Sequence, residues 1–101
     1  MILHLTLKKQ WFDLMVTGQK TIEYRRPSKW IKDRLVGKEY EVVKFVNGYG
    51  DDKPYFLCEY KGYEISKSTK RLDYNGFKIK YEKGDYLIHL GKILESGNLK
   101  N

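Results

Sequence analysis

GQKTIEYR, residues 18–25, places Gly18, Lys20, Glu23 and Arg25 at fixed offsets inside a segment that otherwise has the composition of a β-strand. With usage of about 5–7% for each residue type, roughly 10⁻³ matches to such a spacing are expected by chance in a chain of this length. The pattern therefore indicates a specific structural or functional role. The segment can be either a reactive site or a charged edge strand that leaves a turn.

Side chains of a regular strand alternate between its two faces. Thr21, Glu23 and Arg25 then share one face, and Ile22 and Tyr24 share the other. We expect the apolar pair to face the core. Glu23 and Arg25 become neighbours on the opposite face, close enough for an ion pair.

Lys20 stands at the start of this strand, beside Gly18, whose backbone can turn the lysine toward the same face although strict alternation opposes that placement. As binding groups, Lys20 and Arg25 can hold a phosphate or a base carbonyl. As a catalyst, Lys20 needs a lowered pKa, with Glu23 as general base. Alternatively, the three are a solvent-exposed ionic cluster that contributes little energy.

The flanking sequence predicts a single α+β domain. We expect strands at residues 2–7, 20–26, 40–46, 55–65, 77–81 and 86–94, helices at 8–17 and 28–37, and a polar loop at 66–75. Gly62 is predicted to mark a bulge in its strand, and Ser28 to cap the second helix. The predicted architecture is a small mixed β-barrel of about six strands capped by one or two short helices.

The spacing of Gly18, Lys20, Glu23 and Arg25 matches the G-x-K-x-x-E-x-R signature of ASCH domains, which are PUA-like β-barrels. The preceding helix, the Pro and Ser turn after the motif, the segment VGKEYEVVKFVNGYG and the closing YLIHLGKIL also resemble that family. The resemblance covers residues 1–95 as one domain, and residues 96–101 are predicted to be a frayed tail.

This resemblance implies a cleft that binds RNA, a nucleotide or a nucleoside and is lined by Gly18, Lys20, Thr21, Glu23 and Arg25. Similar bacterial members hydrolyse N4-acetylcytidine, and another member is a ribonuclease, which makes Lys20 and Glu23 candidate catalytic residues. In the amidohydrolase members a threonine stands at the position of Glu23, and a further glutamate comes from a helical insertion. Here only the polar segment 66–75 occupies the place of that insertion.

Composition favours a polyanionic partner. The 101 residues include 20 Lys and Arg against 13 Asp and Glu, a net charge of +7. Nine Tyr, four Phe and two Trp can stack on bases, although most such rings fill the core of a small β-domain. A protein-interaction adaptor, in which the barrel only presents a surface, is a third functional class.

Other residues are candidates for the same cleft. Glu59 can supply a second carboxylate, or be a surface glutamate, and Tyr49 can stack on a base or pack over the barrel rim. The residues that can extend the binding surface are Tyr24, Arg26, Ser28, Lys29 and Trp30. Trp30 is also typical of a core anchor.

The sequence predicts neither a metal site nor a cofactor. His4 and His89 are far apart in sequence, and Cys58 is alone. The single cysteine, the lack of a secretory signal and the absence of an apolar run of roughly 18 residues predict a cytoplasmic protein without a membrane span.

Overall fold

The computed structural model describes residues 1–50 and 52–99. Within these residues the chain has the predicted α+β class, with seven strands and two helices. In chain order the elements are β1 (Ile2–Leu7), α1 (Lys9–Val16), β2 (Ile22–Arg25), α2 (Lys29–Leu35), β3 (Val42–Asn47), β4 (Tyr55–Ile65), β5 (Lys70–Tyr74), β6 (Phe77–Tyr81) and β7 (Tyr86–Gly97).

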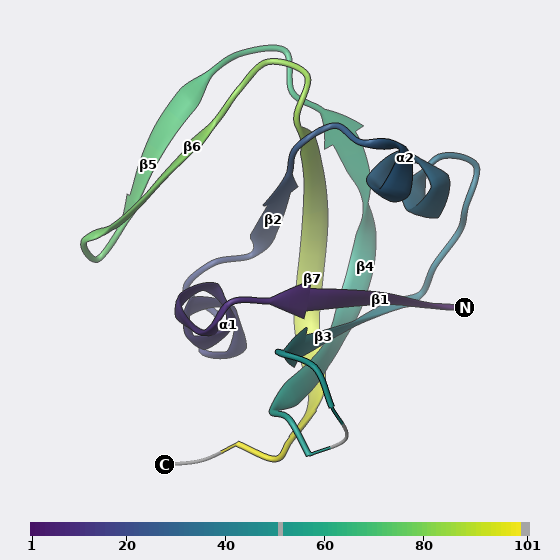
Figure 1. Ribbon diagram of the computed structural model, residues 1–101, viewed down its shortest axis with the longest axis vertical. Coiled ribbons are helices and arrows are strands. Elements are labelled where there is room, and N and C mark those ends of the chain that lie inside the picture. The colour runs from purple at the N-terminus through teal and green to yellow at the C-terminus, as the bar shows by residue number, and fades with distance from the viewer. Residues whose placement is uncertain (51, 100–101) are drawn as a thin grey trace.

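Five strands form one curled sheet in the order β1-β3-β4-β7-β2, and β5 pairs with β6 as a separate hairpin. The β1–β3 pair is parallel, whereas the other neighbours are antiparallel. β1 and β2 are the two edge strands of this sheet and do not pair with each other, which leaves the barrel open between them. In Figure 1, β1 passes in front of β7. The Arg25 Nη2 atom of β2 donates to the Thr6 carbonyl of β1 at 2.9 Å and spans this opening.

One hydrophobic core fills the curl of the sheet. Alternate residues of the strands point into it, as the period of two predicts: Leu3, Leu5, Leu7, Val43, Phe45, Phe56, Cys58 and Ile88. Helix α1 adds Phe12, which packs edge-on against Phe56 with ring centroids 5.2 Å apart. Helix α2, capped by the Ser28 hydroxyl that accepts from the Ile31 amide, adds Ile31 and Leu35.

The two long strands β4 and β7 are irregular where they pair. Their register shifts between Tyr60 and Tyr63, and Gly62 lies within that shift with φ +97°, so the predicted bulge is confirmed. Strand β7 continues to Gly97, which pairs with Tyr55. A side chain at Gly97 would lie 2.5 Å from the Tyr55 ring, so the glycine permits this close pairing.

The prediction of a frayed tail from residue 96 is therefore wrong for Ser96 and Gly97, since both belong to β7. Their backbone groups pair with β4, which a sequence pattern ending in small and polar residues does not reveal. Residues 100–101 of the predicted tail lie outside the described residues.

The segment 66–75 is also not the polar loop that the sequence predicted. Lys70–Tyr74 forms β5 and pairs with β6 through a turn at Asn75 and Gly76, whose φ angles are +53° and +92°. Positive φ at both central residues is the signature of a type I′ hairpin turn, for which Asn-Gly is preferred. In Figure 1 this hairpin extends beyond the sheet, with its tip toward α1.

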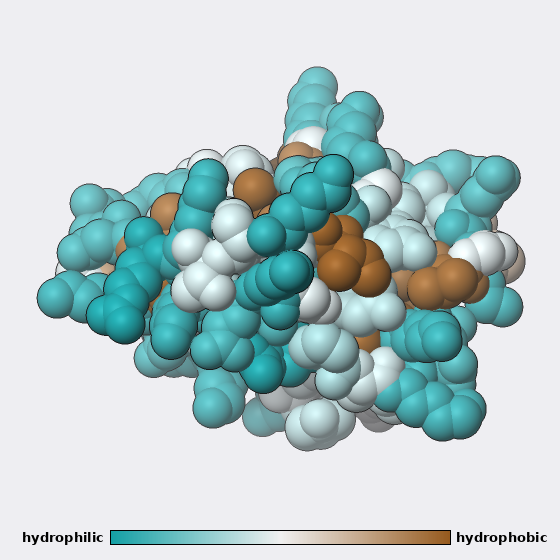
Figure 2. Space-filling view, turned by 90° about the horizontal axis from the view of Figure 1, so that it is seen from above, coloured by the Kyte–Doolittle hydropathy of each residue, from teal (hydrophilic) through white to brown (hydrophobic). Residues whose placement is uncertain are grey.

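Hydrophilic side chains dominate the face of the molecule in Figure 2, with small apolar patches between them. Neither helix of the described residues is long and apolar enough to cross a membrane.

Candidate functional site

Strand β2 presents its charged face to the inside of the barrel. Glu23 pairs with Ile88 of β7, and Arg25 pairs with Tyr86. Directly paired residues point to the same side of a sheet, and Ile88 is fully buried in the core. The expectation that Ile22 and Tyr24 face the core is therefore wrong.

The β5–β6 hairpin explains how Tyr24 can face outward. Its ring stacks on the ring of Tyr81 at 5.2 Å, and its hydroxyl lies 2.8 Å from that of Tyr74. The hairpin thus gives the outer face of β2 an aromatic cover. Burial raises the pKa of the Tyr24 hydroxyl, and the hydrogen bond with Tyr74 raises it further.

Lys20, Glu23 and Arg25 form one ionic cluster on the inner face. Lys20 Nζ lies 3.1 Å from Glu23 Oε1, and Arg25 donates to Glu23 Oε2 from Nε at 2.9 Å. The Lys20 side chain is 0% exposed, that of Glu23 8%, and that of Arg25 25%. One carboxylate therefore holds two cations, and only Arg25 reaches solvent to a substantial extent.

The Lys20 ammonium has a mixed environment. Nζ lies 3.6 Å from Met15 Sδ, 4.9 Å from the centre of the Tyr24 ring and 6.0 Å from that of Trp11. Burial lowers the pKa of Lys20, Glu23 opposes this shift, and Arg25 adds to it. Lys20 therefore loses its proton, to form the neutral amine, more easily than a solvent-exposed lysine does.

The turn that follows α1 brings Lys20 to this position. Gly18 has φ +81°, its amide donates to the Met15 carbonyl at 3.0 Å, and the Gln19 amide donates to the Leu14 carbonyl at 3.0 Å. These bonds form a Schellman motif, in which glycine takes the left-handed position. The Lys20 amide then donates to the same Leu14 carbonyl at 3.2 Å, so the chain turns back beneath the helix.

A cavity of about 490 Å³ opens onto the cluster, and we call it the motif cavity. It is lined by Thr6, Leu7, Lys8, Trp11, Lys20, Glu23, Tyr24, Arg25, Arg26 and Ile79. A second hollow of about 740 Å³, the loop cavity, is lined by His4, Thr6, Leu7, Lys8, Arg25, Trp30, Asn47, Gly48 and Tyr49. The two share four lining residues, so they lie next to each other along the β1–β2 opening, and we call the pair the cleft.

The other candidate residues lie in different places. Tyr49 lines the loop cavity, whereas Gly18 and Thr21 line a small void of about 30 Å³ on another side of Lys20. Glu59 does not join the cluster: its Oε1 accepts from the Lys92 amide at 2.8 Å, which lowers the pKa of its carboxyl. Glu59 follows the buried Cys58 on β4, so alternation turns it away from the core.

Several lining residues were not predicted, or were predicted for another role. Lys8 and Thr6 reach the cleft because β1 borders the opening, a proximity that no local pattern encodes. Trp11 of α1 is partly buried against the core and also lines the motif cavity. Trp30, considered as a core anchor, is 47% exposed and lines the loop cavity instead.

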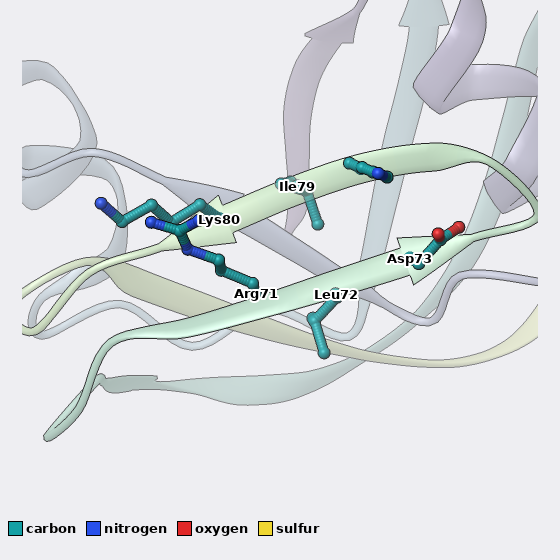
Figure 3. Close-up of a pocket in the computed structure, with 6 residues that line it drawn as sticks. Arg71, Leu72, Asp73, Ile79 and Lys80 are labelled. Atoms are coloured by element: carbon teal, nitrogen blue, oxygen red, sulfur yellow. The ribbon is translucent and has the colours of Figure 1, made fainter.

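Another hollow, of about 570 Å³, lies on the β5–β6 hairpin and is lined by Arg71, Leu72, Asp73, Lys78, Ile79 and Lys80. In Figure 3, Leu72 and Ile79 point to one side of the hairpin, as expected for directly paired residues. Of its lining residues, Ile79 also lines the motif cavity. Because this hollow contains none of Lys20, Glu23 and Arg25, we place the candidate site in the cleft.

Residues 1–50 and 52–99 contain no group of three or more His, Cys, Asp and Glu side chains placed to hold a metal ion. Comparison with protein-family models, with curated proteins and with solved structures finds no match.

Proposed function

We propose that the chain is an ASCH-domain protein that binds RNA or a nucleotide in the cleft beside Lys20, Glu23 and Arg25. The observation that carries this proposal is the position of Arg25, which lines both cavities while Glu23 and the Thr6 carbonyl hold its guanidinium. A cation held in place at the centre of an open cleft loses little conformational entropy when it binds an anion.

Arg25 retains hydrogen-bonding capacity for a ligand. Nε and Nη2 are used by Glu23 and Thr6, and Nη1 has no hydrogen-bond partner among the described residues. The two N–H groups of Nη1 can donate to a phosphate or a base carbonyl. Lys8 adds positive charge to the lining, whereas Arg26 is paired with Glu82 and Asp85.

The motif cavity also suits a base. Trp11 and Tyr24 line it; the Tyr24 ring is already stacked on Tyr81, whereas the Trp11 ring can stack on a base without requiring a particular sequence. Glu23 has a positioning role in this proposal, because its carboxylate orients Lys20 and Arg25. The combination of a fixed cation with aromatic walls favours a nucleotide over a simple anion.

Arg25→Gln tests this function, and Lys61→Gln is a control with the same change in net charge on a side chain paired with Glu59 away from the cleft. We expect Arg25→Gln to weaken binding of a fluorescent single-stranded RNA at least tenfold, since charge-assisted hydrogen bonds contribute about 1.5–3 kcal/mol. Lys61→Gln should change affinity less than about threefold at 0.15 M salt, where exposed charges are screened. Equal affinities of the two variants, or no binding by the wild type to RNA or nucleotides, would contradict the proposal.

The lowered pKa of Lys20 favours a second candidate, a hydrolase. In an N4-acetylcytidine amidohydrolase, water would add to the acetyl carbon and lose a proton to Glu23 or Lys20, and that proton would pass to N4 as the C–N bond breaks, releasing cytidine and acetate. Assays of N4-acetylcytidine and of single-stranded RNA cleavage, with Lys20→Met alongside, test this candidate. Unchanged substrates at high wild-type concentration would exclude both hydrolytic activities.

A further inference from the structure

Two aromatic rings in the loop cavity remain exposed although the protein has a well-packed core. Trp30 of α2 is 47% exposed, and Tyr49 of the β3–β4 loop is 84% exposed. Both line the same hollow of about 740 Å³. Large exposed rings that share a cavity mark a place where a flat ligand can be held.

The Trp30 ring is supported by its own helix. The Arg34 guanidinium carbon lies 3.6 Å from the centre of the ring, and Arg34 Nη1 donates to the Trp30 carbonyl at 3.2 Å. This cation–π contact orders the ring before any ligand binds. Ile31 anchors α2 in the core and Ser28 caps it, so the tryptophan projects from a fixed element.

Tyr49 is presented by a loop whose shape requires glycine. Gly48 and Gly50 have φ angles of +93° and +117°, which place both in backbone regions that disfavour other residues. The Asn47 amide donates to the Pro54 carbonyl at 2.9 Å and ties the base of the loop together. The two glycines thus hold an exposed tyrosine at the rim of the cavity.

Cations lie at the junction between the two cavities. Arg25 and Lys8 line both the motif cavity and the loop cavity. A phosphate that links two nucleotides would meet these cations if one base entered each cavity. Each volume, about 490 and 740 Å³, falls in the range of about 300–1,000 Å³ that is typical of small-ligand sites.

We infer that Trp30 and Tyr49 form a stacking subsite, so that the cleft takes at least two consecutive nucleotides of single-stranded RNA rather than one isolated nucleoside. This inference rests on the proposed function of the Arg25 cleft. Positive charge at the junction complements the phosphate backbone, and aromatic stacking on unpaired bases is the usual mode of single-strand recognition. His4, Thr6 and Asn47 line the cleft with polar groups that can bond to a ribose 2′-hydroxyl.

The test compares cytidine monophosphate with a cytidine tetranucleotide at fixed salt, using Trp30→Ala, Tyr49→Ala and the control Phe77→Ala. Phe77 is 44% exposed on β6 and lines neither cavity. We expect the wild type to bind the tetranucleotide more tightly than the mononucleotide. Trp30→Ala and Tyr49→Ala should each weaken tetranucleotide binding about 5- to 100-fold, as loss of one stacking contact does, with less than about twofold effect on the mononucleotide.

A spectroscopic measurement reports the stacking directly. The chain has two tryptophans, so the tryptophan fluorescence that the wild type has and Trp30→Phe lacks comes from Trp30. We expect the tetranucleotide to quench it and the mononucleotide to leave it unchanged.

Three results would overturn the inference while the proposed function still holds. They are equal affinity for the mononucleotide and the tetranucleotide, affinities of Trp30→Ala and Tyr49→Ala that match Phe77→Ala, and an oligodeoxynucleotide that binds as tightly as the RNA. If the wild type binds neither the mononucleotide nor the tetranucleotide, the proposed function itself fails.

Discussion

Glu23 pairs with two buried or partly buried cations through a single carboxylate. Lys20 occupies one oxygen at 3.1 Å, and Arg25 occupies the other at 2.9 Å. Removing one partner of a buried ion pair is costly when it leaves an uncompensated charge, whereas replacing a whole buried pair by apolar groups of similar volume is often neutral or stabilising. The three motif residues therefore contribute unequally to stability.

Glu23→Gln is expected to lower the free energy of unfolding by about 3–5 kcal/mol, because it leaves Lys20 and Arg25 facing each other without a counter-charge. Lys20→Met is expected to cost less than about 1 kcal/mol or to stabilise the fold, because Glu23 keeps Arg25 and a desolvated ammonium is removed. Urea denaturation at pH 7 measures both changes. A Lys20→Met variant as unstable as Glu23→Gln would show that the lysine has a structural role.

At the scale of elements, the junction of α1 and β2 carries the motif glycine. Gly18 makes no close approach, since a Cβ there would meet nothing within 4 Å. Glycine is required at position 18 because the Schellman turn needs a left-handed backbone there, with φ +81°. The glycine thus acts by directing Lys20 beneath the helix and need not contact a ligand.

Gly18→Ala is expected to lower the free energy of unfolding by about 1–2 kcal/mol, the cost of a left-handed residue with a Cβ. Gly18→Asn should cost less, because asparagine adopts this conformation more readily. Thermal unfolding of both variants measures the difference. If both variants kept full stability but lost RNA binding, the glycine would instead be required by the ligand.

The β5–β6 hairpin covers the outer face of β2, so that Tyr24 of β2 is packed away from the core. The Asn75-Gly76 pair was a local signal for a type I′ turn, and it could have predicted the β5–β6 hairpin. Its consequence for β2 was not local, because the contact of Tyr24 with Tyr74 and Tyr81 spans about fifty residues of sequence. Alternation correctly grouped Glu23 with Arg25, but it did not determine which face of β2 was inside.

At the scale of the whole molecule, ionisable groups buried by the fold couple stability to pH. Burial in the core raises the pKa of Cys58 from 9.0 to about 12. Its contribution to stability is complete below pH 9 and is lost as pH rises through about 12, because the unfolded thiol ionises first. The pH dependence of stability that Lys20 causes has the opposite sign. Because the pKa of Lys20 is lowered in the folded state, its contribution to the free energy of unfolding rises with pH up to 10.5, where the unfolded lysine loses its proton.

We expect the free energy of unfolding to fall between pH 9 and pH 12, and to fall less steeply in Cys58→Ala than in the wild type. The slope with pH is the measured quantity, since removal of a core side chain shifts the whole curve. In a Lys20→Met background the decline above pH 9 should be steeper, because the opposing contribution of the lysine is gone. Parallel curves for Cys58→Ala and the wild type would rule out a buried thiol as the cause.

Local sequence patterns were enough to predict the α+β class, most element positions, the Gly62 bulge, the Ser28 cap and the Lys20–Glu23–Arg25 spacing. These features depend on periodicity and backbone preference, which act over a few residues. The three-dimensional fold was needed to see that β1 and β2 border a common opening, where Lys8 and Arg25 line the same cavity. It also places the Glu59 carboxylate on the Lys92 amide, away from the cluster. It also decided that the charged face of β2 lies inside. The physical reason is that strand order, sheet curl and hairpin packing are set by contacts between residues far apart in the chain, which no local pattern encodes.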